Sequence, residues 1–188
     1  MEDINQHIKP LLTGCNKGDQ NAQFELYKMY YKAMYNTAYR ILNDSYEAED
    51  VMQEAFLSAF TKLDTFKGEV TFGAWLKRIV INRSLTQLKR INRIDETSFE
   101  DVEYKMEVIS DEDNRNHDYS ELKAKEIVQT MQQLKESYRV ALSLSLIEGY
   151  DNEEVAQIMK ISDANCRTMI SRAKSKLREL LSENTVVN

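Results

Sequence analysis

The side chains best suited to chemistry near the C-terminus are arginines, lysines and hydroxyls. From Lys160 to Arg178 the chain has six basic residues and one acid, Asp163. Apolar residues recur at helical spacing from Cys166 to Leu177 and predict one buried helix face. Arginine can pair with guanine edges through two hydrogen bonds, while hydroxyls and lysines can hold phosphates. The candidate residues for contacts with duplex DNA are Arg167, Thr168, Ser171, Arg172 and Lys174.

A short helix and a tight turn precede this basic helix. Asp151 can accept hydrogen bonds from first-turn amides, and Glu154 follows at the spacing of a capping box. Ala156 is small enough for a close helix crossing, and Ser162 can cap the next helix after a turn at Lys160. These features predict a helix-turn-helix whose second helix enters the major groove. The same pattern also fits an ordinary solvated helix of a small bundle.

A second basic stretch lies in the N-terminal half. From Trp75 to Arg93 there are six basic residues and no acid. Positive charge beside aromatic rings and a neutral amide suits single-stranded or melted DNA, and the predicted loop Asp64–Thr71 could hold an unstacked base. The candidate residues for these contacts are Phe66, Lys67, Arg78, Asn82 and Lys89. The alternative interpretation is a solvated basic face over a tryptophan core.

An acidic helix is predicted just before this basic one. In the stretch Glu47–Glu54, Ala48 and Met52 would pack inward, which leaves the acids on the outer face. Such a face repels DNA and suits a basic protein surface, although it could also be merely solvated. The candidate residues for this protein contact are Asp50, Gln53 and Glu54.

These faces require helices, and the composition favours them. The 188 residues include only one proline and five glycines, so long helices meet few breakers. The predicted fold class is all-α, with an N-terminal helical bundle and a C-terminal helix-turn-helix domain joined by an acidic linker. The predicted parts are an N-terminal extension (1–19), a bundle (20–93), a linker (94–118), a helix-turn-helix domain (119–182) and a flexible tail (183–188).

Charge is sorted along the chain. The stretch Asp95–Glu121 has eleven acids and two bases, a charge of −9. Since the whole chain carries −6, the remainder carries +3. The acidic total therefore does not exclude a nucleic-acid partner, because the distribution of charge decides the electrostatic footprint.

Several functions are not expected. There is no glycine-rich phosphate loop, no HExxH motif and no cysteine–histidine pair, so we expect no catalysis, no metal and no cofactor. Cys15 and Cys166 are too far apart for a disulfide framework, and we expect one exposed thiol and one buried one. No apolar run approaches the roughly 20 residues of a membrane span. We also find no signal peptide, and therefore expect a cytoplasmic protein without membrane insertion.

Four stretches together resemble the extracytoplasmic-function (ECF) group of bacterial sigma factors. They are EAEDVMQEAFL at Glu47–Leu57, FKGEVTFGAWLKRIVIN at Phe66–Asn82, EGYDNEEVAQIMKIS at Glu148–Ser162 and RTMISRAKSKLREL at Arg167–Leu180. The first two are highly specific in combination. The resemblance covers residues 20–93 as a region 2-like domain and residues 119–182 as a region 4-like domain.

The resemblance implies a role for each candidate set. The candidate residues on the acidic helix, such as Asp50, would contact the clamp helices of the polymerase β′ subunit. The candidates around Asn82 would recognise the −10 element. The candidates around Arg172 would read the −35 element. It also implies docking on the β flap, threading of the linker into the polymerase, and an anti-sigma factor as a further partner, which many members have. The alternative function is a stand-alone helix-turn-helix regulator with an N-terminal effector domain.

Several positions depart from the family pattern, among them Lys135, Asn165, Cys166 and Met169, and the departure at Lys160 bears on the backbone. The turn of the helix-turn-helix usually has glycine where Lys160 stands. A residue other than glycine at positive φ costs about 1 kcal/mol. We therefore expect a tighter or differently shaped turn at this position.

Overall fold

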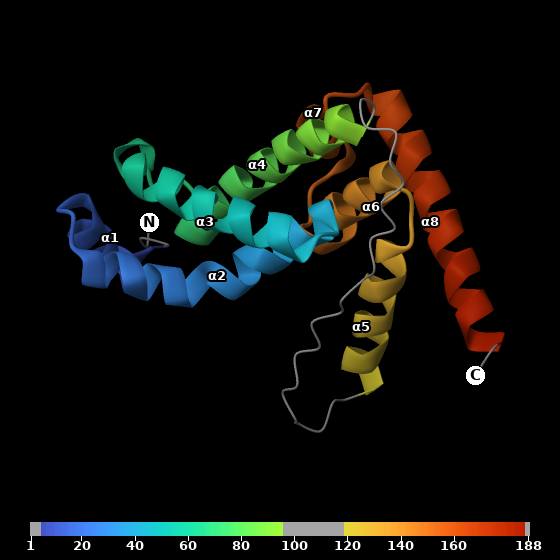
Figure 1. Ribbon diagram of the computed structural model, residues 1–188, viewed down its shortest axis with the longest axis horizontal. Helices are drawn as coiled ribbons and strands as arrows, with labels where there is room; N and C mark the ends of the chain where they lie inside the picture. The colour runs from blue at the N-terminus through green and yellow to red at the C-terminus, as the bar shows by residue number, and fades with distance from the viewer. Residues whose placement is uncertain (1–4, 96–118, 187–188) are drawn as a thin grey trace. The chain divides into compact units, whose positions relative to one another are not determined.

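The chain forms helices throughout the parts that the structure describes. The computed structural model describes residues 5–95 and 119–186, and its contacts divide the chain into two compact units at Arg90. The first unit contains η1 (Gln6–Ile8), α1 (Lys9–Asn16), α2 (Gln20–Leu42), α3 (Ser45–Thr61), η2 (Leu63–Thr65) and, up to Arg90, α4 (Phe72–Asp95). The second contains α5 (Tyr119–Gln132), α6 (Glu136–Leu142), the π-helical turn η3 (Ser143–Ile147), α7 (Asn152–Met159) and α8 (Asp163–Val186), as Figure 1 shows. The predicted all-α, two-domain fold class is confirmed.

Two helices continue further than expected. α4 extends to Asp95, and α8 continues through residues 183–186, which we had assigned to a tail. Most of the predicted acidic linker lies outside the described residues. The division into linker and domains therefore stays a prediction.

α2 and α3 lie side by side in the N-terminal unit (Figure 1). The chain reverses at Asn43, whose φ of 58° is left-handed, and the carboxylate of Asp44 then accepts a 2.9 Å hydrogen bond from the amide of Glu47. Of the two residues that could cap this helix by type, Asp44 and Ser45, Asp44 is thus the N-cap. Helical spacing predicts one buried stripe on each helix: Tyr27, Tyr31, Met34, Ala38 and Ile41 on α2, and Met52, Phe56, Ala59 and Leu63 from α3 into η2. All of these residues except the two tyrosines are buried.

Tyr31 is an error in the predicted α2 stripe. Its side chain is 45% exposed and stacks on Tyr27 with ring centroids 5.7 Å apart. Leu26, which the pattern did not include, is fully buried instead. A tyrosine at the edge of a helix face can keep its hydroxyl in water, whereas leucine gains by full burial.

α8 organises the C-terminal unit, because it contacts α5, α6 and α7. Its predicted core face, Cys166, Ile170, Ala173 and Leu177, is buried. Gly149 has φ +81° and follows the π-helical turn, as expected of a glycine that ends a helix. Helical spacing predicts a buried stripe of Leu122, Ile127, Met131 and Leu134 at α5. This prediction is partly wrong, since Leu122 and Ile127 are exposed and only Met131 and Leu134 are buried.

Both cysteines are buried, so the expectation of one exposed thiol was wrong. Cys15 is 5% exposed and Cys166 is fully buried. Cys15 lies in the last turn of α1, and α1 packs against α2. The segment before α2 is thus part of a packed structure.

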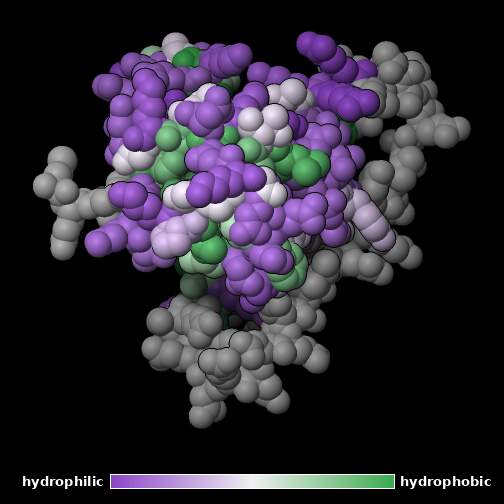
Figure 2. Space-filling view, turned by 90° about the vertical axis from the view of Figure 1, so that its left-hand side faces the viewer, coloured by the Kyte–Doolittle hydropathy of each residue, from purple (hydrophilic) through white to green (hydrophobic). Residues whose placement is uncertain are grey.

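The described residues are mainly hydrophilic on the face that Figure 2 shows. Figure 2, viewed from the side where α1 lies in Figure 1, shows smaller hydrophobic areas between polar side chains. Within the described ranges, no helix has the length and apolar character that a bilayer crossing requires.

A close approach between α2 and α4 yields a stability prediction. A Cβ added at Gly73 would lie 2.8 Å from the ring of Tyr30, which itself packs edge-on against Phe72. We expect Gly73→Ala to destabilise the protein by about 1–3 kcal/mol, measured by thermal unfolding, because the core would be overpacked. In a Tyr30→Ala background the same change should instead stabilise by up to about 1 kcal/mol, because alanine is the better helix former. Equal effects in both backgrounds would contradict the steric explanation.

Candidate polymerase and promoter-DNA interfaces

The helix-turn-helix is formed by α7, a turn and α8. Asp151 accepts a 2.8 Å hydrogen bond from the amide of Glu154, whose carboxylate accepts a 2.9 Å bond from the amide of Asp151. This is the predicted capping box. Val155 and Ala156 are buried, and the hydroxyl of Ser162 accepts from the amide of Asn165 at 3.3 Å.

Lys160 adopts the backbone conformation that usually favours glycine. Its φ is 58° and its ψ is 47°, so it is left-handed. The expectation of a differently shaped turn was therefore wrong. The turn keeps its left-handed residue because the amides of Lys160 and Ile161 bond back to α7 carbonyls, and the lysine bears the strain.

The outer face of α8 carries the predicted duplex-DNA residues. Arg167, Thr168, Ser171 and Arg172 are exposed, while Lys174 is half-buried. The hydroxyl of Thr168 donates to the carbonyl of Ala164 at 2.9 Å, so it retains only acceptor capacity for a ligand. Arg167 and Arg172 lie five residues apart, less than one and a half helical turns. Both guanidinium groups are thus available on one stretch of the helix.

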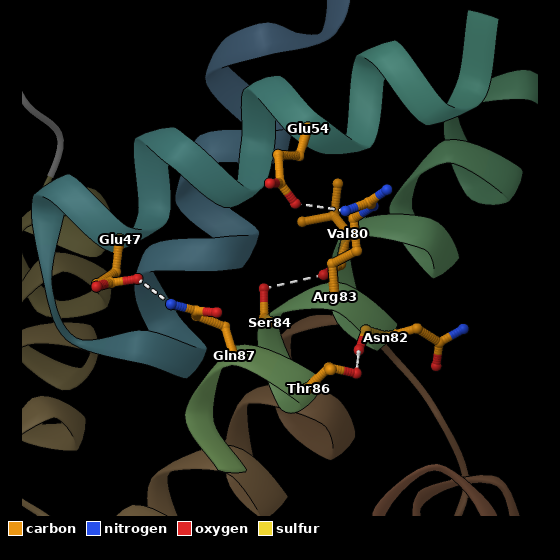
Figure 3. A network of polar contacts seen from close by, with 8 residues as sticks. All are labelled: Glu47, Glu54, Val80, Asn82, Arg83, Ser84, Thr86 and Gln87. Carbon is orange, nitrogen blue, oxygen red and sulfur yellow. Dashed lines mark hydrogen bonds and ion pairs between the residues drawn. The ribbon is translucent and has the colours of Figure 1, made fainter. Parts of the chain in front are cut away.

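α4 presents the predicted basic face to solvent. Arg78, Asn82 and Lys89 are exposed, while Leu76, Val80 and Ser84 are buried on the other side. In Figure 3 the amide of Asn82 points away from the contacts that α4 makes with α3. Arg78, Asn82 and Lys89 therefore lie on the side of α4 that faces away from the core.

The loop before α4 separates the two residues predicted there. Phe66 is half-buried, and its ring packs on Phe72 at 5.8 Å and on Trp75 at 5.3 Å. Lys67 is exposed beside Gly68, whose φ is +75°. Lys67 is free to meet a ligand, whereas Phe66 mainly anchors the loop to the core.

The acidic face of α3 is partly paired with α4. Glu54 forms an ion pair with Arg83, and the carboxylate of Glu47 accepts from the amide of Gln87 at 2.7 Å (Figure 3). The side chain of Asp50 is exposed and has no hydrogen bond or ion pair with any residue that the structure describes. The outward position of Glu47 and Glu54 was predicted from helical spacing. Their partners Arg83 and Gln87 were not predicted, because no local sequence signal connects two helices that are far apart in the chain.

A groove of about 510 Å³ lies between these two helices. Its α3 side contains Glu54, and its α4 side contains Asn82 and Arg83. The remaining lining residues are Val51, Ser58, Lys62, Ile79, Thr86, Gln87 and Arg90. One predicted protein-contacting residue and one predicted DNA-contacting residue thus share the groove.

A helix-turn-helix with an exposed basic face, together with a second helical unit bearing basic and acidic faces, defines a two-domain class of DNA-binding protein. Comparison with known families specifies the class. Residues 26–94 match Sigma-70 region 2, and residues 124–177 match Sigma-70 region 4.

Whole-length relatives agree with these matches. The chain is 30% identical to the RNA polymerase sigma-H factor of Pseudomonas aeruginosa, over 91% of this chain and 92% of that protein. It is 30% identical to the ECF RNA polymerase sigma-E factor of Escherichia coli K12 (89% and 90% covered) and 27% identical to the ECF sigma factor SigW of Bacillus subtilis (93% and 96% covered). The chain belongs to the ECF group of RNA polymerase sigma factors. Its function is therefore promoter-directed transcription initiation, and the alternative of a stand-alone regulator is not favoured.

Solved structures share the fold. The sigma factor RpoE, in complex with the anti-sigma factor NepR from Bartonella quintana, aligns with a TM-score of 0.62 at 23% identity, over 84% of this chain and 95% of that one. CnrH, in complex with the cytosolic domain of CnrY, aligns with a TM-score of 0.54 at 24% identity, over 92% and 96%.

The strained turn gives a prediction about the C-terminal unit. We expect Lys160→Gly to stabilise it by up to about 1 kcal/mol, because glycine adopts positive φ without a steric penalty. Hydrogen exchange of the α7 and α8 amides would measure the gain. Lys160→Ala removes the same charge but keeps the strain, so it should give no gain. An equal gain from alanine would attribute the effect to charge and not to the backbone.

Proposed function

We propose that the three exposed faces divide the work of initiation. The acidic face of α3, with Asp50, Gln53 and Glu54, binds the clamp helices of the polymerase β′ subunit. The loop at Lys67 and the basic face of α4 contact the −10 element. The outer face of α8 reads the −35 element, with Arg167 and Arg172 as the base-reading residues. The observation that carries this proposal is the segregation of charge, with acids on α3 and bases on α4 and α8.

The −10 contacts belong to exposed side chains in a small region. Asn82 offers an amide that can bond to a base edge, and Arg78 and Lys89 offer charge for the phosphates. Lys67 is exposed in the loop that directly precedes α4. Phe66 contributes to this site by holding the loop, because its ring is packed against Phe72 and Trp75.

Other parts of the proposal follow from family membership. The C-terminal unit docks on the β flap, and the acidic linker threads into the polymerase. The protein acts in the cytoplasm, without catalysis of its own and without a metal or cofactor. An anti-sigma factor is a further proposed partner, since the aligned RpoE and CnrH structures are both complexes, the first with an anti-sigma factor.

Reconstitution with core RNA polymerase tests the whole proposal. The complex should initiate at specific promoters, while the free chain should bind promoter DNA poorly. Tight, specific duplex binding by the free chain, without a requirement for polymerase, would favour the stand-alone regulator.

The two main acids should contribute unequally to polymerase binding. We expect Asp50→Ala to weaken binding by about 1.5–3 kcal/mol, as for a lost hydrogen bond to a charged group. Glu54→Ala should cost less, because Glu54 already pairs with Arg83 and must share or exchange this partner. Titration of core polymerase with labelled protein at several salt concentrations would measure both. Glu25→Ala removes an exposed α2 carboxylate that pairs with Lys28 and is the matched control. An equal loss of polymerase binding in Glu25→Ala would show that the effect of Asp50→Ala comes from net charge alone.

Arg172 should discriminate between base sequences. Arg172→Ala should weaken binding of the holoenzyme to its −35 element by about 1–3 kcal/mol, the range for a bidentate contact to guanine. Arg172→Lys keeps the charge but loses the planar fork, so it should retain phosphate-driven affinity and lose sequence preference. Selection from a library randomised at −35 would measure both effects. An unchanged −35 preference in both variants would reject the assignment.

A further inference from the structure

Asn5 is a buried polar residue bonded to a segment far away in sequence. Its side chain is almost inaccessible, with the residue 4% exposed. The amide nitrogen donates to the carbonyl of Val70 at 3.0 Å, and the amide oxygen accepts from the backbone N–H of Phe72 at 2.8 Å. An amide that satisfies two backbone groups at once is costly to remove, because the buried N–H of Phe72 would be left without a partner and the carbonyl of Val70 would lose its bond to the N-terminal segment.

These two bonds fall at the end of the loop that precedes α4. Phe72 is the first residue of α4, and its N–H has no carbonyl partner within the helix. Val70 is the residue two places earlier, and its side chain is 48% exposed. Asn5 therefore fixes both the last residues of the loop and the first peptide of the helix.

The other end of the loop is held by a different interaction. The N–H of Phe66 donates to the carbonyl of Leu63 at 3.1 Å, and the Phe66 ring packs against Phe72 and Trp75. Between the two anchors, Lys67, Gly68 and Glu69 are exposed. The loop is thus a short exposed arch with an aromatic anchor at its start and the Asn5 amide at its end.

Asn5 is itself held in place by the segment that follows it. The amide of Ile8 donates to the carbonyl of Asn5 at 3.0 Å, and the Ile8 side chain is 1% exposed. α1 then packs so closely on α2 that a Cβ at Gly14 would lie 2.8 Å from Cβ of Ala22. The N-terminal segment is therefore docked firmly enough to support a hydrogen-bonded position.

We infer that Asn5 is a positioning residue for −10 recognition: it fixes the shape of the loop at Phe66–Thr71, so that Lys67 meets promoter DNA in one arrangement. This inference rests on the proposed −10 role of the loop and of α4. Asn5 itself touches no DNA. It acts through Val70 and Phe72, and it makes the segment before α2 part of the specificity machinery.

The test uses holoenzyme reconstituted from the full chain and core polymerase, on a promoter library randomised at −10 and −35. Asn5→Ala should lower initiation from the preferred −10 sequences about tenfold and flatten the −10 preference, since a loosened loop samples unproductive positions. Affinity for core polymerase and the −35 preference should change by less than about twofold. Asn5→Asp keeps the acceptor for Phe72 but removes the donor to Val70, and should behave like alanine.

Asn16→Ala makes the same chemical change at an exposed position of α1 and should leave every readout unchanged. A parallel fall in polymerase affinity and initiation in Asn5→Ala would show a general loss of packing and overturn the inference. Wild-type behaviour of either Asn5→Ala or Asn5→Asp would also overturn it. Lys67→Ala and Asn82→Ala, tested with the same promoter library, distinguish a failure of the proposed −10 site from a failure of the inference about Asn5. If they leave the −10 preference intact, the proposed function of the loop and α4 fails; if only Asn5→Ala does so, the inference alone fails.

Discussion

Burial of one apolar stripe per helix is the constraint on which the functional surfaces depend. On α3, Ala48 and Ala55 are fully buried, and this fixes the acids on the opposite side. On α8, Cys166 and Ala173 do the same for the arginines. At 3.6 residues per turn, a helix that buries one stripe has no freedom to rotate its charges elsewhere. The positions of the acidic and basic faces therefore follow from core packing.

The α3–α4 contact connects the two surfaces of the N-terminal unit. Glu54 belongs to the acidic face, and its partner Arg83 lies next to Asn82 on the basic helix. Exposed ion pairs contribute only about 0–1 kcal/mol. Either member of the pair can therefore exchange its partner for an external one at small cost.

Local periodicity predicted most of the fold and the exposed faces from the sequence. The stripes ending at Ile41 and Leu177, the cap at Asp44 and the capping box at Asp151 depend on neighbours within a few residues, and these predictions hold. Failures occurred where distant contacts decide burial, as at Tyr31, Leu122 and Cys15. The ion pair of Arg83 and the bonds of Asn5 join positions separated by 29 to 67 residues, and no local pattern marks them. At Lys160, a local steric rule was outweighed by the hydrogen bonds of the turn.

The two cysteines provide one chemical probe in each structural unit. Burial raises the pKa of the Cys15 thiol, with a further contribution from Asp19, and burial together with Asp163 raises that of Cys166. Little reactive thiolate is present at neutral pH while the helices stay closed. Alkylation rates at the two thiols would then report how often each unit opens, and no cysteine would have to be introduced by mutation. A tagged alkylating reagent could measure the local opening of one unit while the other unit is bound to a partner.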